Sequence, residues 1–105
     1  MNLIEFVEYL KKPSEIEGVI IESNPDLDID YADIYLENEL NIYSEMYFLN
    51  AEEISGGLEI LYEKKRLINL FLLFHLQEMF EEFNLKGKNN IEIAKDILDF
   101  RIKDA

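Results

Sequence analysis

Residues 13–63 contain no Lys, Arg or His, yet they hold 14 of the 23 acidic residues of the chain. This base-free segment carries a charge of −14, whereas the remaining residues, nine acidic and ten basic, carry +1. Like charges at this density repel one another and oppose folding. Because the acids alternate with Ile, Leu and Tyr, the pattern predicts a folded segment with an acidic face rather than a loose acidic tail.

The whole chain is expected to form one domain over residues 1–105. Its apolar fraction is 49%, with seven Phe and six Tyr, which is enough to bury one core. There is no Cys, so the chain can form neither a disulfide nor a thiolate metal site. A small secreted domain would often need such cross-links, and a reducing cytoplasm is therefore the simpler location.

The sequence shows neither a signal peptide nor a membrane helix. Glu5 and Glu8 stand where a signal peptide would be apolar. The most apolar run, residues 67–76, contains Asn69 and His75 and falls short of the ~20 residues of a membrane helix. We therefore expect a soluble cytoplasmic protein that does not associate with a membrane.

Apolar spacing predicts a helix at each end of the chain. In residues 2–12, Asn2 and Glu5 have the spacing of a capping box, and Pro13 closes the helix. A last helix is expected to begin at a capping Asn90. The expected apolar faces are Leu3, Phe6, Val7 and Leu10 in the first helix, and Ile91, Ala94, Leu98 and Ile102, widened by Ile93, Ile97 and Phe100, in the last.

The middle of the chain predicts a small sheet. The first expected elements are a strand at 18–22, a short helix near 30–40 and a strand near 45–49. After a turn at Gly56–Gly57, a hairpin is expected, with strands at 58–62 and from Leu67 joined by a turn at 63–66. A helix should then run from about Leu70 to Phe83, with its cap at Lys86–Gly87. Residues 26–31 read equally as a strand or as a helix start. The fold class is therefore α+β, with a small, mostly antiparallel sheet flanked by N- and C-terminal helices.

Four acids of the base-free segment have the spacing of a calcium loop. Asp26, Asp28, Asp30 and Glu37 occupy positions 1, 3, 5 and 12 of an EF-hand. Position 6, which needs Gly for a sharp turn, is Tyr31. We expect no resident metal or cofactor, and a Ca²⁺-binding module remains an alternative.

The sequence offers little for catalysis or nucleic-acid binding. The single His, His75, lies in an apolar run and is expected to be a core residue, and there is no Cys nucleophile, Gly-rich phosphate loop or G-x-S-x-G elbow. Phosphate contacts need Lys and Arg, and the one cluster, residues 64–66, is expected to be a solvated turn. We expect no enzyme, no catalytic residue and no binding of nucleic acid.

A basic protein partner fits the base-free segment best. Carboxylates steer and pair with Lys and Arg, and Tyr supplies a large contact area at low entropic cost. The residues expected to contact such a partner are Asp26, Asp28, Asp30, Tyr31, Asp33, Tyr35, Glu37, Glu39, Tyr43 and Glu45. Nucleases carry the most basic functional clefts, so filling such a cleft with carboxylates would block one.

The overall pattern from ADIYLENEL through GGLEI and LFLLFHLQEM to the ending IEIAKDILDFRIKDA resembles the small acidic immunity proteins of bacterial contact-dependent growth inhibition systems. The resemblance implies a cytoplasmic toxin inhibitor that binds the toxin domain of a delivered effector, often a nuclease and foremost an RNase, and covers its active site. It implies no catalysis and no cofactor, and we expect a monomer that binds the toxin 1:1. The alternative is a nucleic-acid mimic of the anti-restriction or anti-CRISPR type.

Overall fold

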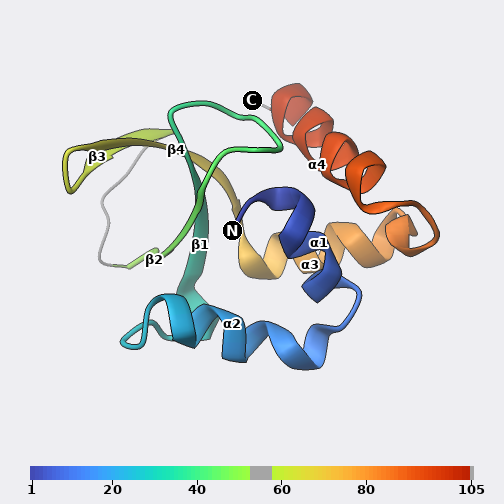
Figure 1. The fold of residues 1–105 in the computed structure, drawn as a ribbon, viewed down its shortest axis with the longest axis horizontal. Coiled ribbons are helices and arrows are strands. Elements are labelled where there is room, and N and C mark those ends of the chain that lie inside the picture. Colours follow the sequence, from blue (N-terminus) through green and yellow to red (C-terminus); the bar gives the residue numbers. More distant parts are fainter. Residues whose placement is uncertain (53–57, 105) are drawn as a thin grey trace.

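One four-stranded antiparallel sheet organises the chain, of which the computed structural model describes residues 1–52 and 58–104. Its strands run in the order β2-β1-β4-β3, and α1, α3 and α4 lie together on one side of it (Figure 1). The strands are β1 (Ala32–Glu37), β2 (Met46–Asn50), β3 (Glu59–Tyr62) and β4 (Lys65–Leu72). The helices are α1 (Leu3–Leu10), α2 (Ile16–Ser23), α3 (Leu73–Glu82) and α4 (Asn90–Asp104), with 3-10 turns η1 (Pro13–Glu15), η2 (Ile29–Tyr31) and η3 (Leu85–Gly87). The expected α+β class is confirmed.

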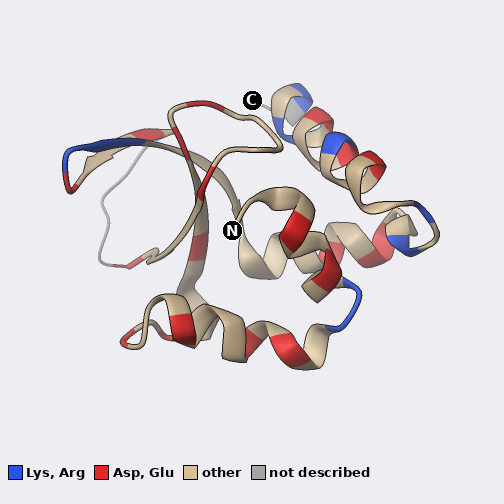
Figure 2. Ribbon diagram, in the orientation of Figure 1, with Lys and Arg blue, Asp and Glu red and all other residues tan. Residues whose placement is uncertain are grey.

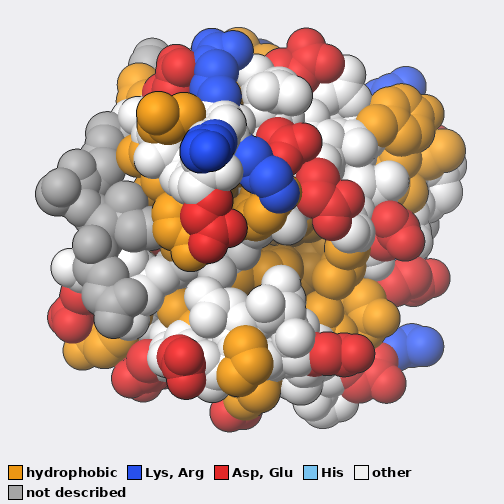
Figure 3. Space-filling model, turned by 60° about the vertical axis from the view of Figure 1, so that its left-hand side comes forward, with side chains coloured by type: hydrophobic (Ala, Val, Ile, Leu, Met, Phe, Trp, Pro, Cys, Tyr) orange, Lys and Arg blue, Asp and Glu red, His pale blue; other side chains and the backbone are white. Residues whose placement is uncertain are grey.

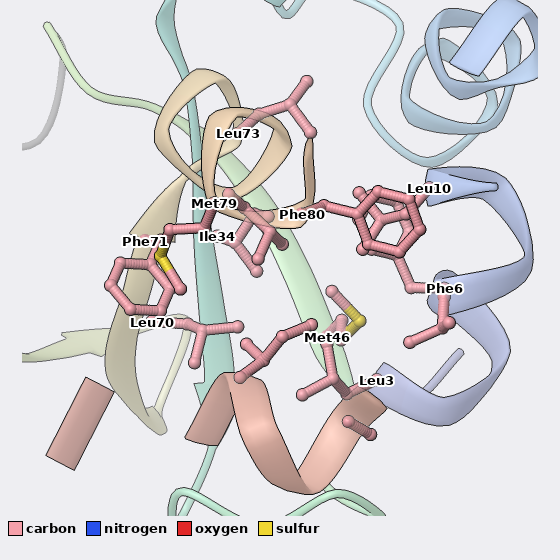
Figure 4. Packing of buried hydrophobic residues seen from close by; sticks show 14 of the residues in the cluster. Leu3, Phe6, Leu10, Ile34, Met46, Leu70, Phe71, Leu73, Met79 and Phe80 are labelled. Atoms are coloured by element: carbon pink, nitrogen blue, oxygen red, sulfur yellow. The ribbon is translucent and has the colours of Figure 1, made fainter. Parts of the chain in front are cut away.

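The main core lies between the helices and the inner face of the sheet. Alternate residues of β1, Ala32, Ile34 and Leu36, are buried there, as the two-residue period of a strand requires. Side chains of α1 and α3 converge on the sheet residues Ile34 and Met46 from two sides (Figure 4). This packing of α1 and α3 on β1 and β2 fixes which face of β1 points outward.

A bulge in β4 joins the sheet to α3. Tyr35 is opposite Asn69 and Asp33 is opposite Leu72, so two residues of β4, at 70 and 71, stand opposite Ile34. A bulge of this kind bends its strand. Both extra side chains enter the core, and α3 begins at Leu73, directly after the strand. The expected helix start near Leu70 is therefore wrong, because strand pairing continues through Leu72.

The expected hairpin is confirmed with a tighter turn. Glu63 and Lys64 both have positive φ, 49° and 68°, as a two-residue type I′ turn requires. Lys65 and Arg66, expected in the turn, begin β4 instead. The first helix and its capping box are also confirmed, since the amide of Glu5 donates to Asn2 Oδ1 and the amide of Asn2 to Glu5 Oε1.

Two assignments in the base-free segment are wrong. The expected strand at 18–22 is helix α2, in which Ile16 and Ile20, one helical turn apart, are buried. The expected helix near 30–40 is strand β1. A spacing of four, as from Ala32 to Leu36, satisfies both the two-residue strand period and the helical period, so pairing with β2 and β4 decides between them. The strand near 45–49 is confirmed as β2.

The helix ends near the C-terminus also differ. α3 stops at Glu82, and Asn84 follows in a left-handed conformation, so Lys86–Gly87 is not its cap. Asn89, not Asn90, caps α4, since its Oδ1 accepts from the amide of Glu92 at 2.9 Å. The buried residues of α4 are Ile93, Ala94, Ile97, Leu98 and Arg101, whereas Ile91 and Ile102 of the expected stripe are exposed. The expected Gly56–Gly57 turn lies outside the described residues.

Arg101 explains the rotation of α4 relative to the expected stripe. Its side chain is buried and its Nε donates to the main-chain oxygen of Asn69 at 3.0 Å. A buried polar group needs such a partner, and the bond pins α4 to β4. Among residues 1–52 and 58–104, no helix has the length and apolar character needed to cross a membrane.

Two Phe residues provide a matched test of the core. Phe6 is 0% exposed and packs on Phe48 at 5.4 Å between ring centroids, whereas Phe74 is 66% exposed on α3. Phe6→Ala should lower the free energy of unfolding by about 3–5 kcal/mol, and Phe74→Ala by less than about 0.5 kcal/mol. Urea denaturation of both variants checks this; equal losses would contradict the packing of α1 on β2.

Candidate functional site

The ten expected contact residues fall into three separate places. The first group lies before β1 and consists of Asp26, Asp28, Asp30 and Tyr31. The second group lies on β1, points away from the helices, and consists of Asp33, Tyr35 and Glu37. The third group lies in the loop between β1 and β2 and consists of Glu39, Tyr43 and Glu45. A six-residue strand extends about 17 Å, so β1 holds the first and third groups apart. The base-free segment is therefore not one continuous contact surface.

The loop between β1 and β2 is held in shape by its own hydrogen bonds. Asn41 Oδ1 accepts from the amide of Tyr43 at 2.8 Å, and Ser44 Oγ donates to the main-chain oxygen of Glu39 at 2.8 Å. Arg66 reaches the loop from β4 and donates to the main-chain oxygen of Asn38 at 2.9 Å. Bonds of this kind favour Asn and Ser in turns, and they order the loop before any partner arrives.

This loop surrounds a surface hollow of about 470 Å³. Three carboxylates line it, those of Glu37, Glu39 and Glu45, together with Tyr43, whose side chain is 68% exposed. Glu45 Oε1 also accepts from the N-terminal ammonium of Met1 at 2.7 Å, which ties the loop to the start of the chain. We call Glu37, Glu39, Tyr43 and Glu45 the β1–β2 loop site.

A basic residue marks one border of the β1–β2 loop site. Tyr47 Oη donates to Glu37 Oε1 and accepts from Lys65 Nζ, both at 2.9 Å. The hydrogen bond to Tyr47 raises the pKa of Lys65. Glu37 is therefore oriented and partly compensated by Lys65 at 4.0 Å. Figure 2 shows the basic residues of the β3–β4 hairpin beside acidic residues of the same hairpin.

The face of the sheet away from the helices, here called the outer face, has its own small apolar cluster. Tyr35, Leu49 and Leu67 are buried there, with Tyr47, Ile60 and Tyr62 packed around them. A view of the side of the molecule that carries the β3–β4 hairpin shows hydrophobic side chains at the bottom of a hollow, with charged side chains around it (Figure 3). Tyr35 is only 3% exposed, so it is not available as the expected anchor.

Asp33 takes part in the same outer face rather than in a free acidic surface. Its Oδ1 accepts from Asn69 Nδ2 at 2.8 Å. Burial raises the pKa of Asp33 above its ordinary value of 3.8, although hydrogen bonds from Asn69 and Tyr35 oppose the rise. Burial, followed by the charge of Asp33, raises the pKa of Tyr35. The pair is thus held inside the sheet face and is poorly placed to meet a partner.

The calcium-loop spacing does not produce a calcium loop. Asp28 Oδ1 accepts from the amide of Asp30 as the cap of a 3-10 turn, and β1 then carries Glu37 to the opposite end of the strand. An EF-hand needs its first and twelfth residues on the same ion. Within the described ranges 1–52 and 58–104, no three His, Asp or Glu residues gather closely enough to hold a metal ion.

Two further expectations concern basic side chains. His75 is exposed on α3 rather than buried, with its ring 5.3 Å from that of Phe71, so the expectation of a core residue is wrong. Lys64 is exposed in the hairpin turn, as expected, while Arg66 pairs with Glu59, which lowers the pKa of that carboxyl. The cluster is thus partly neutralised.

A second acidic and aromatic surface lies on α3 and has no counterpart in the sequence predictions. Phe74, 66% exposed, lies beside Glu78, Glu81 and Glu82 in an open hollow of about 680 Å³. The sequence contains a signal for this surface. Leu73, Leu76 and Phe80 follow the helical spacing of a buried face, and Phe74 does not, which predicts that Phe74 is exposed. The apolar residues around Phe74 make this difference in spacing hard to recognise.

Comparisons with known proteins provide no relative for this chain. No protein-family model, curated protein or solved structure matches it.

The pH dependence of stability tests the position of Asp33. Because the folded-state pKa of Asp33 is raised, the folded state holds the proton more tightly than the unfolded state, and stability falls as pH rises from about 3.8 to the raised pKa. The stability of wild type relative to Asp33→Asn should therefore be lower at pH 7 than at pH 3. Urea denaturation of both proteins across this range measures the difference.

Asp26→Asn provides the matched control, because Asp26 is exposed in the loop before β1. If Asp33→Asn and Asp26→Asn changed the pH profile equally, the burial of Asp33 would not be the cause.

Proposed function

We propose that this protein is an immunity protein that binds a cognate toxin domain and covers its basic active-site cleft, the toxin being a nuclease and foremost a ribonuclease. The observation that supports the proposal most is the β1–β2 loop site, a preformed hollow with carboxylates and an exposed Tyr43 in a segment of 51 residues without a basic side chain. The resemblance of the sequence to immunity proteins adds to it.

The chemistry of the β1–β2 loop site suits Lys and Arg of a nuclease cleft. Glu39 is exposed and Glu45 is half-exposed, so both can accept charge-assisted hydrogen bonds. Tyr43 offers an aromatic contact for the partner surface or for a cation above its ring. Since the loop is already ordered by Asn41 and Ser44, little conformational entropy is lost on binding.

The acidic groups outside this site have a different part in the proposal. Asp26, Asp28 and Asp30 lie at the other end of β1 and cannot enter the same small cleft as Tyr43. Their charges add to the net charge of the whole molecule, which is −13, and so to the negative electrostatic field around it. Such a field speeds the encounter with a basic partner, and salt weakens it.

A growth experiment tests the function directly. The product of the gene immediately upstream is expressed in a neutral host with and without this protein, and survivors are counted. We expect that product to kill and this protein alone to restore growth. A harmless neighbour, or killing that continues despite this protein, would contradict the proposal. Inhibition of a restriction or CRISPR nuclease instead would indicate the nucleic-acid mimic.

Two Tyr residues test where the toxin binds. Tyr43→Ala should raise the off-rate of the complex by roughly 10-fold to 100-fold, because a buried aromatic anchor contributes about 2 kcal/mol or more. Tyr31→Ala, at the other end of β1 and 41% exposed, is the control and should change the off-rate less than about threefold. Surface plasmon resonance measures both; a larger effect of Tyr31→Ala would move the contact to the loop before β1.

A further inference from the structure

The two edges of the sheet differ in whether the outward polar groups of the edge strand have hydrogen-bond partners. At the β2 edge, the amide of Met46 donates to the main-chain oxygen of Met1 at 2.9 Å, and Asn24 Nδ2 donates to the main-chain oxygen of Phe48 at 3.0 Å. These two contacts occupy polar groups that a further strand would need. At the β3 edge, no other strand of the described residues pairs with β3 on its free side.

The backbone of β3 shows which groups point outward. The amide of Asn69 on β4 donates to the main-chain oxygen of Leu58 at 2.9 Å, so the polar groups of Leu58 face β4. Because the direction alternates along a strand, those of Ile60 and Tyr62 also face β4, and those of Glu59 and Leu61 point away from the sheet. An exposed edge of this kind is a template for another strand.

Apolar side chains accompany this free edge. Leu61 is 80% exposed, more than any other large hydrophobic side chain among residues 1–52 and 58–103, and Leu58 is 63% exposed. The hairpin that carries them projects from the rest of the molecule (Figure 1). Natural edge strands are usually protected by charge, Pro or a covering element, and Leu61 on β3 has the opposite character.

We propose that β3 pairs with β3 of a second copy of this chain, antiparallel about a twofold axis, to form a continuous eight-stranded sheet. The outward groups of Glu59 and Leu61 would bond to those of Leu61 and Glu59 in the second copy. On the outer face this register sets Leu58 against Tyr62 and Ile60 against Ile60, so every cross-strand pair there is apolar. Cross-strand apolar pairs of this kind stabilise antiparallel sheets.

Charge favours a second copy in this register. The chain carries −13 overall, so two copies repel over most of their surfaces. Residues 58–66 contain two acidic and three basic residues, and this hairpin is therefore a place where two copies can meet without that repulsion. A shift by two residues in one direction would set Glu59 against Glu59, which like-charge repulsion disfavours. A shift in the other direction would set Glu59 against Glu63, which lies in the hairpin turn and not on β3, so fewer residues could pair.

Sedimentation equilibrium tests the association. The interface is short, so we expect the chain to remain the monomer expected from its sequence below about 10 µM, and its average mass to rise from one chain to two between about 10 µM and 1 mM. Leu58→Lys replaces the apolar cross-strand pair of Leu58 with Tyr62 and should weaken the association at least about tenfold. Ile102→Lys on α4, which also replaces an exposed apolar side chain (59% exposed), should leave it unchanged. An average mass that stays at one chain throughout would overturn the proposal. If the mass rose only when another protein was added, the β3 edge would be assigned to a strand of that other protein, and the proposed dimer would be wrong.

A cross-linking experiment tests the register. The chain contains no Cys, so a single introduced Cys can form a disulfide only between copies. Ile60→Cys places the two sulfurs on directly opposed residues, within the Cα separation that a disulfide tolerates, whereas Leu61→Cys places them two positions off and beyond about 7 Å. In oxidised glutathione, Ile60→Cys should give a disulfide-linked dimer faster than Leu61→Cys. Because Leu61 is the more exposed residue, the reverse order would indicate random collision and overturn the register.

Discussion

Burial of the inner side chains of β1 is the constraint on which the rest of the structure depends. Ile34 and Leu36 have no exposed surface, and they lie between the neighbouring strands and the helices α1 and α3. A strand that is paired on both edges and covered on one face has a single permitted register, because a slip by one residue would expose the whole apolar set. The bulge opposite Ile34 adjusts β4 to this register and directs the chain into α3.

The same constraint decides how the negative charge is displayed. Since Ile34 and Leu36 point inward, Asp33, Tyr35 and Glu37 must point to the outer face. There Asp33 and Tyr35 are partly or fully enclosed, and Glu37 is held by Tyr47. Among the ten residues expected to contact a partner, the freely accessible acids therefore lie at the two ends of β1. Of these ends, the β1–β2 loop combines carboxylates with an ordered hollow and an exposed Tyr43.

Several parts of the fold followed from short-range signals. The capping box of α1 joins residues three positions apart, and the hairpin of β3 and β4 pairs residues no more than nine positions apart; the sequence predicts both. The types of α2 and β1 are not predicted correctly, because the isoleucine-rich run of α2 suits a strand or a buried helix, and the four-residue spacing in β1 fits both periods. The cap of α4 is Asn89 and not Asn90, a difference of one residue, and the buried face of α4 includes Arg101, whose bond to β4 no local spacing predicts.

By itself, the sequence determined the composition of the surface: a segment without basic residues, enough apolar residues for one core, and an α+β arrangement with helices at both ends. These properties follow from residue types and local spacing. The tertiary structure alone decided which acids share a surface and that Tyr35 is buried while Tyr43 is exposed. It also decided that the β2 edge is capped, whereas no strand of the described part of the chain pairs with the outer edge of β3. The physical reason is that strand pairing joins residues far apart in the chain, and no local pattern states which face of a central strand the helices will cover.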